Sequence, residues 1–372
     1  MTQANQIIIY GASGYTGKLI AESLHNRGLA FTAAGRTKEK LHKALDVVAG
    51  RAEVANIDAK VATAQHTEQS LVELFTGAKV VVNVTGPFSE IGEVVVKSAL
   101  QAGCHYLDTT GEQDFMLDMK EKYGAAFAEK DLLLAPACSY MWTLGGLAAE
   151  VTLEDSAIDS LEISYTSDQG VPSVASSQSF MRMLAAPHFY LKNNELTPWE
   201  LGRTFDVVIP GKTQVFKGSA WGGAAEPAWY AEDQRVRNCR VYNCADDNET
   251  MELLSGIIKQ IVEGSDGNFE AGQAAAIRTA GDFFQSEPEK EDPLVHRGIV
   301  HCSGNGSAVR SSCTISFHSP YVMTGELIAE CSRLLLEGAP NTVGFSSPAA
   351  AFGHRELLKM LADQGFLSVS EE

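Results

Sequence analysis

Residues 6–17, QIIIYGASGYTG, decide the fold of this chain. The run from Ile7 to Tyr10 is apolar and rich in β-branched residues, which predicts a short buried strand. Three glycines follow at three-residue spacing, and Lys18 to Arg27 then has an apolar face at helical spacing. Strand, glycine turn and helix in this order are typical of a site for the phosphates of a dinucleotide.

Glycines allow the chain to turn tightly and let backbone N–H groups approach a pyrophosphate, while the positive end of the helix dipole faces the same phosphates. The spacing G-x-x-G-x-x-G is less specific than G-x-G-x-x-G, so an ordinary strand–helix turn is the alternative. The residues predicted to bind the cofactor here are Gly11, Ser13, Gly14, Tyr15, Thr16 and Gly17.

The end of the next predicted strand indicates which nucleotide is bound. Proteins that bind NAD usually place Asp or Glu there, to accept hydrogen bonds from the ribose. This chain has Gly35 and Arg36, with Lys38 and Lys40 close behind. A guanidinium suits a 2′-phosphate because it is planar and always charged. The sequence therefore predicts NADP(H), bound through Arg36 and Lys38; the alternative is that Arg36 is a solvated residue at the start of a helix.

The charge distribution agrees with this prediction. Residues 1–60 carry eight Lys or Arg and five Asp or Glu, a net charge of +3, whereas the whole chain has a net charge of −18. A local positive field attracts an anionic ligand. The acidic remainder argues against nucleic acid as a partner.

The first third of the chain alternates apolar runs with helical patterns, which predicts a Rossmann-type parallel sheet with helices on both faces. We expect strands at 30–34, 53–58, 79–84, 105–108 and 132–134. Ligands of such sheets lie beyond the carboxyl ends of the strands. This reasoning places further residues along the cofactor cleft: Asp58, Asn83, Thr85, Gly86, Pro87 and the stretch Asp108 to Glu112.

The length of 372 residues suggests two domains. From about residue 137 alternating strands appear at 161–166, 204–209 and 309–317, and we expect a second α+β domain built on an antiparallel sheet. A helix is expected at 271–284, and further helices at 323–336 and 355–364. The predicted division is 1–136 for the nucleotide, 137–320 for substrate and dimerisation, and 321–372 as helices returning to the first domain. The four tryptophans fall within 138–230, either lining an apolar pocket or packing in a core.

Other classes of protein are disfavoured by what the chain contains. There is no run of about eighteen apolar residues and no basic-then-apolar signal at the start, so we expect no membrane span and a cytoplasmic location. The seven cysteines are scattered, without zinc spacing, which predicts reduced thiols and no metal site.

Several stretches together resemble the saccharopine dehydrogenase-like oxidoreductases, a group that includes trans-acting enoyl reductases. The similarity is nearly continuous over about 140 residues and loose in the middle of the chain. Besides the glycine turn it rests on Ala34-Gly35-Arg36, Val82 to Phe88, His105 to Glu112, Ala135 to Cys138 and Ser346 to Ala351.

The resemblance implies an NADP-type domain, a second domain on an antiparallel sheet and a C-terminal helix that packs on the first domain. One segment departs from the family pattern. Enoyl-reductase-like members usually continue from Ala-Cys with Gly-Phe-Asp-Ser, whereas this chain has Ser139-Tyr140-Met141-Trp142. We expect this difference to alter the substrate or the activity itself.

The chain carries no self-contained catalytic signature such as Tyr-x-x-x-Lys, G-x-S-x-G or H-E-x-x-H. As an enzyme it would rely on the cofactor for hydride transfer to a C=C or C=N bond of a small, apolar or lipid-like substrate. Tyr140 and then Glu112 are the candidate proton donors; the alternative is that each is a hydrogen-bonded structural residue. An amino-acid-type dehydrogenase using Arg182, Arg203 and Arg278, and a regulatory protein without turnover, are the other hypotheses. A homodimer is the default expectation.

Overall fold

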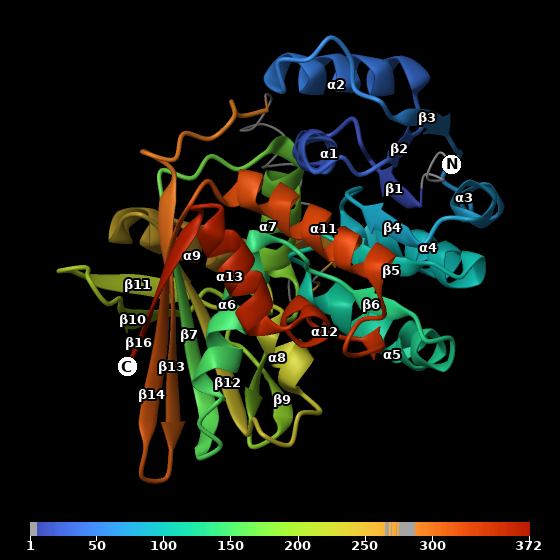
Figure 1. The fold of residues 1–372 in the computed structure, drawn as a ribbon. Coiled ribbons are helices and arrows are strands. Elements are labelled where there is room, and N and C mark those ends of the chain that lie inside the picture. Colours follow the sequence, from blue (N-terminus) through green and yellow to red (C-terminus); the bar gives the residue numbers. More distant parts are fainter. Residues whose placement is uncertain (1–5, 265–267, 269, 273, 275–286) are drawn as a thin grey trace. The chain divides into compact units, whose positions relative to one another are not determined.

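The protein is described from a computed structural model, which covers every residue except 1–5, 265–267, 269, 273 and 275–286. It contains two compact units, which are discontinuous in sequence (Figure 1). Unit 1 comprises 1–110, 115–140 and 321–357, and unit 2 comprises 111–114, 141–320 and 358–372. The predicted helix at 271–284 lies outside the described residues, except for a few positions at its start.

Unit 1 is a seven-stranded sheet in the order β15-β6-β5-β4-β1-β2-β3, and all of its strand pairs are parallel. Its strands are β1 (Ile7–Tyr10), β2 (Phe31–Gly35), β3 (Lys60–Thr63), β4 (Val80–Asn83), β5 (His105–Asp108), β6 (Leu133–Ala135) and β15 (Gly344–Phe345). Its helices are α1 (Tyr15–Asn26), α2 (Lys38–Arg51), α3 (Glu68–Phe75), α4 (Phe88–Ala102), α5 (Gln113–Glu129), α11 (Pro320–Glu337) and α12 (Pro348–Phe352). The predicted Rossmann-type parallel sheet is confirmed.

The register of this sheet aligns the carboxyl ends of its central strands. Tyr10 pairs with Ala34 of β2 and with Asn83 of β4, and Asn83 pairs with Asp108 of β5. The loops after β1, β2, β4 and β5 therefore leave the sheet at one edge. Because the strand order reverses between β1 and β4, this edge contains the switch point at which such sheets bind ligands.

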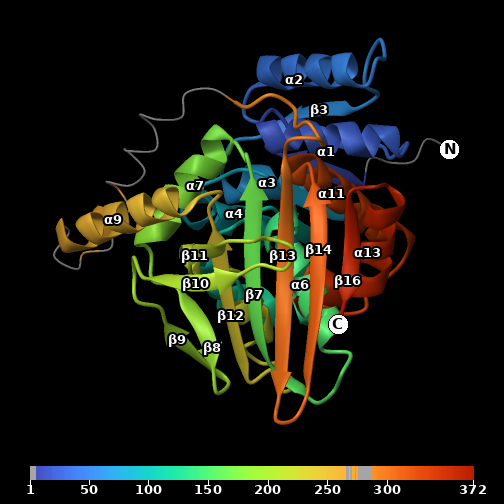
Figure 2. The same cartoon turned by 90° about the vertical axis from the view of Figure 1, so that its left-hand side faces the viewer.

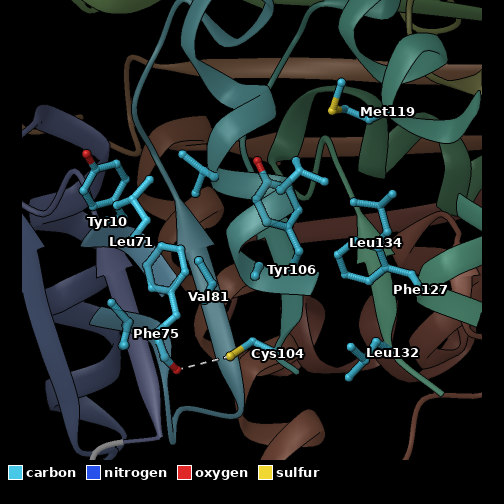
Figure 3. Close-up of a cluster of buried hydrophobic side chains, with 14 of the residues drawn as sticks. Tyr10, Leu71, Phe75, Val81, Cys104, Tyr106, Met119, Phe127, Leu132 and Leu134 are labelled. Atoms are coloured by element: carbon cyan, nitrogen blue, oxygen red, sulfur yellow. Dashed lines mark hydrogen bonds between the residues drawn. The ribbon is translucent and has the colours of Figure 1, made fainter. Parts of the chain in front are cut away.

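A buried apolar cluster fills the space between this sheet and helices α3, α4 and α5 (Figure 3). Phe75 at the end of α3 is fully buried and meets the ring of Tyr10 edge-on, with ring centroids 6.3 Å apart. The Sγ of Cys104 lies 3.4 Å from the carbonyl oxygen of Phe75. The buried side chains of these three helices thus point at the sheet.

Unit 2 is built on a nine-stranded sheet whose main path runs β10-β11-β12-β7-β13-β14-β16, with β8 paired to β12 and β9 paired to β8. Figure 2 shows β7, β13 and β14 side by side, with α6 behind them. The strands are β7 (Ile158–Asp168), β8 (Phe189–Lys192), β9 (Glu195–Pro198), β10 (Thr204–Val208), β11 (Val215–Ser219), β12 (Asn238–Cys244), β13 (Arg297–Gly306), β14 (Arg310–His318) and β16 (Leu367–Glu371). The helices are α6 (Tyr140–Thr152), α7 (Val174–Ala185), α8 (Glu226–Tyr230) and α9 (Asn248–Gly264), with a short 3-10 turn η1 (Trp221–Gly223).

Two details of this unit differ from the predictions. The sheet is mostly antiparallel, but β12 runs parallel to β7. The segment after residue 357 does not stay with unit 1, because α13 (His354–Asp363) leads into β16, which pairs with β14 as an edge strand. Residues 321–357 belong to the first unit.

We expect Phe75→Ala to lower the free energy of unfolding of unit 1 by about 3–5 kcal/mol, because it removes a fully buried ring and leaves a cavity. Denaturant unfolding followed by circular dichroism measures this. The matched control is Val47→Ala in α2, a side chain that is 40% exposed, which should change the free energy by less than about 0.5 kcal/mol. Equal effects of the two substitutions would contradict the assignment of this core.

Candidate dinucleotide site

The glycine turn is fastened to the neighbouring strand by its own backbone. The N–H groups of Gly11 and Ala12 both donate to the carbonyl oxygen of Ala34, at 2.9 and 3.2 Å, and Gly14 donates to the carbonyl oxygen of Gly11 at 3.0 Å. Gly14 then caps α1, which has no acidic residue in its first turn. The first N–H groups of a helix have no intrahelical acceptor, so the amino end of α1 suits an anion.

Two of the three glycines are required by space. A Cβ on Gly17 would lie 2.6 Å from the carbonyl oxygen of Gly11, and one on Gly11 would lie 2.9 Å from both the carbonyl oxygen of Val84 and the side chain of Thr85. Gly11 also has φ +99°, in the left-handed region that favours glycine. A Cβ on Gly14 would meet only one atom, at 3.4 Å, and this residue is exposed. The turn is therefore a cradle of the kind that fits a pyrophosphate.

Arg36 follows β2 directly and is exposed, as are Lys38 and Lys40. The guanidinium of Arg36 also acts on Tyr10. Burial raises the pKa of the Tyr10 phenol, and the positive charge of Arg36 opposes that rise. No carboxylate stands at the end of β2, in contrast to proteins that bind a ribose with Asp or Glu. The residues present therefore suit a 2′-phosphate.

His66 was not predicted to lie at this edge. Its Nδ1 is 2.9 Å from the hydroxyl of Tyr10, its Nε2 is 3.0 Å from the carbonyl oxygen of Ile91, and its ring stacks on that of Tyr10. It follows β3, which runs from Lys60 to Thr63 rather than over 53–58. Had the third strand been placed correctly in the sequence, His66 would have been expected at this edge.

The same displacement corrects the prediction for Asp58. This residue is exposed and precedes β3, so it lies on the amino side of that strand, away from the carboxyl edge. The reason is that α2 extends to Arg51 and Glu53 has φ +54°, which keeps the following residues in a loop. The strand with the better pairing begins at Lys60, opposite Thr32 of β2.

The loop after β4 is held by Asn83. The Oδ1 of Asn83 accepts hydrogen bonds from the N–H and the hydroxyl of Thr85, at 3.0 and 2.6 Å, and its Nδ2 donates to the hydroxyl of Tyr106. Asn83 is fully buried, Gly86 is exposed, and the bond between Gly86 and Pro87 is cis. Thr85, Gly86 and Pro87 thus lie at the predicted edge. Asn83 is buried and fixes the turn through its hydrogen bonds with Thr85.

Asp108, at the end of β5, likewise makes hydrogen bonds that hold loops of the protein. Its Oδ1 accepts from the N–H groups of Thr110 and Ala137, both at 2.9 Å, and its carbonyl oxygen accepts from Cys138 at 2.8 Å. The carboxylate therefore joins the chain after β5 to the chain after β6.

Glu112, the second candidate proton donor, is fully buried in unit 2 and paired with Arg182 at 3.0 Å. It also accepts a hydrogen bond from the hydroxyl of Ser179 at 2.7 Å, and Arg182 reaches Asp114 at 2.5 Å. An arginine shared by two carboxylates fixes the segment 111–114 to α7. This arrangement favours the structural interpretation of Glu112.

Tyr140, the first candidate, is half-buried, and its backbone N–H donates to the hydroxyl oxygen of Thr324 at 3.0 Å. The segment that departs from the family pattern continues with an irregular start to α6. Met141 is extended and Trp142 has φ +70°, which is unusual for a bulky residue. Trp142 itself is fully buried.

The tryptophans pack in aromatic clusters of unit 2. Trp142 meets Tyr165 edge-on with centroids 5.4 Å apart, Trp221 lies 4.2 Å from Phe180, and Trp199 packs against Tyr190 and Phe205. Trp142 is therefore a core residue, whereas Trp199 and Trp221 are half-buried and pack against their aromatic neighbours.

A buried Tyr–Glu pair was not expected from the sequence. The hydroxyl of Tyr165 accepts from the N–H of Gly145 at 2.8 Å and donates to Oε1 of Glu226 at 2.6 Å. Burial raises the pKa of Glu226 to about 8, and the hydrogen bond from Tyr165 opposes this rise. Full burial of this carboxyl group thus favours its protonated form.

Among the described residues, no group of three or more His, Cys, Asp or Glu is arranged to hold a metal ion. In the same part of the chain, no helix is long and apolar enough to cross a membrane.

A parallel sheet with a glycine cradle at its switch point and an arginine after the second strand defines a dinucleotide-binding protein. Residues 7–128 match the model of the saccharopine dehydrogenase NADP binding domain, which confirms the NADP(H) prediction. The chain belongs to the family described as "Family of unknown function (DUF5938)", whose model matches residues 143–370.

Curated relatives match the first part of the chain. A lipid droplet localized protein of Caenorhabditis elegans is 35% identical over 140 residues, which are 36% of this chain and 33% of that protein. The saccharopine dehydrogenase-like oxidoreductase of Rattus norvegicus is 28% identical over 193 residues, 49% of this chain and 42% of the relative. A Mycobacterium tuberculosis protein named as a trans-acting enoyl reductase is 30% identical over 136 residues, 36% of this chain and 32% of the relative. The matches thus span a third to two-fifths of the length of these relatives.

Among solved structures, the apo saccharopine dehydrogenase (L-Glu forming) of Saccharomyces cerevisiae matches with a TM-score of 0.62. The match covers 99% of this chain and 100% of that one at 10% identity, so it shows a shared fold. Together with the match of residues 7–128 and the curated relatives, it confirms the predicted resemblance to saccharopine dehydrogenase-like oxidoreductases.

The pair Tyr165–Glu226 makes stability depend on pH. The unfolded carboxyl loses its proton near pH 4.5 and the folded one near pH 8, so the free energy of unfolding falls as pH rises through this window, by at most about 1.4 kcal/mol per pH unit. We expect Glu226→Gln to flatten this slope, because the amide keeps the hydrogen bond without a charge. Thermal unfolding of unit 2 between pH 5 and pH 8 measures it, with the exposed Glu162→Gln as control. Identical slopes for Glu226→Gln and the unmodified protein would contradict the assignment.

Proposed function

We propose that this protein is an NADPH-dependent oxidoreductase that reduces a C=C or C=N bond of an apolar or lipid-like substrate. The observation that carries the proposal is the glycine cradle beside Arg36, in a domain that matches an NADP-binding model. The names of two relatives, one located at lipid droplets and one an enoyl reductase, support an apolar substrate.

Hydride transfer is the chemistry that a nicotinamide supplies when bound. The residues of the chain then have separate tasks. The N–H groups of the glycine turn bind the pyrophosphate, and Arg36 and Lys38 bind the 2′-phosphate. Thr85, fixed by Asn83, borders the turn at Gly11. Tyr140 remains the candidate proton donor, since Glu112 is held in its ion pair.

A dehydrogenase acting on a C–N bond of an amino acid is the second candidate, because the fold is that of a saccharopine dehydrogenase. Such an enzyme needs arginines that bind substrate carboxylates. Arg182 is already shared by Glu112 and Asp114, and Arg203 is exposed and pairs with Glu200. Arg278 lies outside the described residues. The occupied Arg182 makes this candidate the weaker one. A cytoplasmic location and a homodimer stay predictions.

We expect Arg36→Glu to weaken NADPH binding by tenfold or more while leaving NADH binding unchanged or stronger. The reason is that a charged hydrogen bond contributes about 1.5–3 kcal/mol, and 1.4 kcal/mol is a factor of ten. Isothermal titration with both nucleotides measures the change. Lys60→Glu is the matched control, an exposed charge at the amino end of β3. An unaltered preference in Arg36→Glu would refute the NADP assignment of this residue.

Turnover is tested by following NADPH absorbance with a panel of enoyl lipids and imines. We expect consumption with enoyl lipids, and its loss in Gly17→Ala, whose added Cβ would lie 2.6 Å from the carbonyl oxygen of Gly11. Consumption with imino acids alone would favour the second candidate. NADPH binding without turnover on any substrate would contradict the enzyme proposal and favour a regulatory nucleotide-binding protein.

A further inference from the structure

Helix α11 comes from the far end of the sequence and crosses α1 within unit 1 (Figure 1). The crossing is close, because a Cβ on Gly325 would lie 2.9 Å from both the carbonyl oxygen of Leu19 and the Oγ of Ser23. Beyond it, Arg27 at the end of α1 reaches Glu326 at 2.8 Å and Glu330 at 2.6 Å. These contacts fix the helix to the middle and the end of α1.

The first turn of α11 reaches the glycine turn. The ring of Tyr321 meets the ring of Tyr15 edge-on, with centroids 5.1 Å apart and planes at 88°. Tyr15 is the first residue of α1, directly after Gly14, and it is buried. The packing of its ring therefore bears on the position of the glycine turn at the start of this helix.

The same stretch of α11 also holds the chain after β6. Thr324 accepts the hydrogen bond from the N–H of Tyr140, and the thiols of Cys138 and Cys331 are 3.6 Å apart. Thr324 thus touches a different segment from Tyr321, although it is only three residues away. Substitutions at Tyr321 and at Thr324 can therefore distinguish the packing of the Tyr15 ring from the attachment of α11 as a whole.

We propose that Tyr321 is a positioning residue for the dinucleotide: its ring fixes Tyr15 and thereby the N–H groups of the glycine turn that bind the pyrophosphate. The proposal rests on the function proposed above and deepens it. It gives α11 a role in cofactor affinity, which the glycine pattern alone does not predict. Tyr321 acts through Tyr15 and is given no contact with the nucleotide.

The test measures NADPH affinity by fluorescence titration in three variants. Tyr321→Ala should weaken binding by about threefold to tenfold, the range that an edge-to-face ring pair contributes beyond its buried area. Tyr321→Phe keeps the ring and should bind as the unmodified protein does. Thr324→Val removes the acceptor of the Tyr140 N–H but leaves the ring pair, and should also bind normally.

Unchanged NADPH affinity in Tyr321→Ala would overturn the proposal. An equal loss of affinity in Thr324→Val would also overturn it, because any loosening of α11 would then be enough to weaken NADPH binding. If Tyr321→Ala does not fold, hydrogen exchange on the unmodified protein decides. NADPH should slow exchange at 321–325 as well as at 13–17, and protection confined to 13–17 would overturn the proposal. Failure of the unmodified protein to bind NADPH would instead refute the proposed function.

Discussion

The backbone contact between the glycine turn and β2 is the constraint on which unit 1 depends. Two successive N–H groups, from Gly11 and Ala12, converge on the carbonyl oxygen of Ala34, and the next residues of β2 are Gly35 and Arg36. One interaction therefore sets both the position of the phosphate cradle and its distance from the guanidinium. The absence of a Cβ at Gly11 and Gly17 is a condition of the same geometry, because either would collide with backbone. Specificity for the nucleotide is thus built on the register of two neighbouring strands.

The sequence was most informative where local patterns and tertiary demands agree. The strand at Ile7 to Tyr10 was predicted because its β-branched residues favour a strand, and all four residues of this strand are buried in the sheet. The third strand was predicted at Glu53 to Asp58, whereas pairing with Thr32 selects the segment that starts at Lys60. Strand pairing is a non-local choice that alternation alone does not encode.

The buried polar groups of unit 2 were missed for a related reason. Glu112 and Arg182 are seventy residues apart, and Tyr165 and Glu226 are sixty-one apart, so no spacing along the chain marks them as pairs. Their chemistry arises only when segment 111–114 meets α7 and when β7 meets α8. A carboxyl group was accordingly proposed as a proton donor from its position after a strand, and the structure instead shows it neutralised by an arginine. The parallel pairing of β12 with β7 escaped prediction in the same way.

Segment 138–142 brings these constraints together. Cys138 is tied to Asp108 through its N–H, and Tyr140 is tied to α11 through Thr324, so the chain enters this stretch with its backbone fixed by unit 1. Trp142 then takes a left-handed conformation that a bulky side chain rarely adopts, and its ring is held by Tyr165. Such strain persists only where the surroundings over-determine it. The departure from the family pattern therefore coincides with a stretch whose conformation depends on packing, and the left-handed backbone of Trp142 has to be considered together with the Tyr165 ring that holds it.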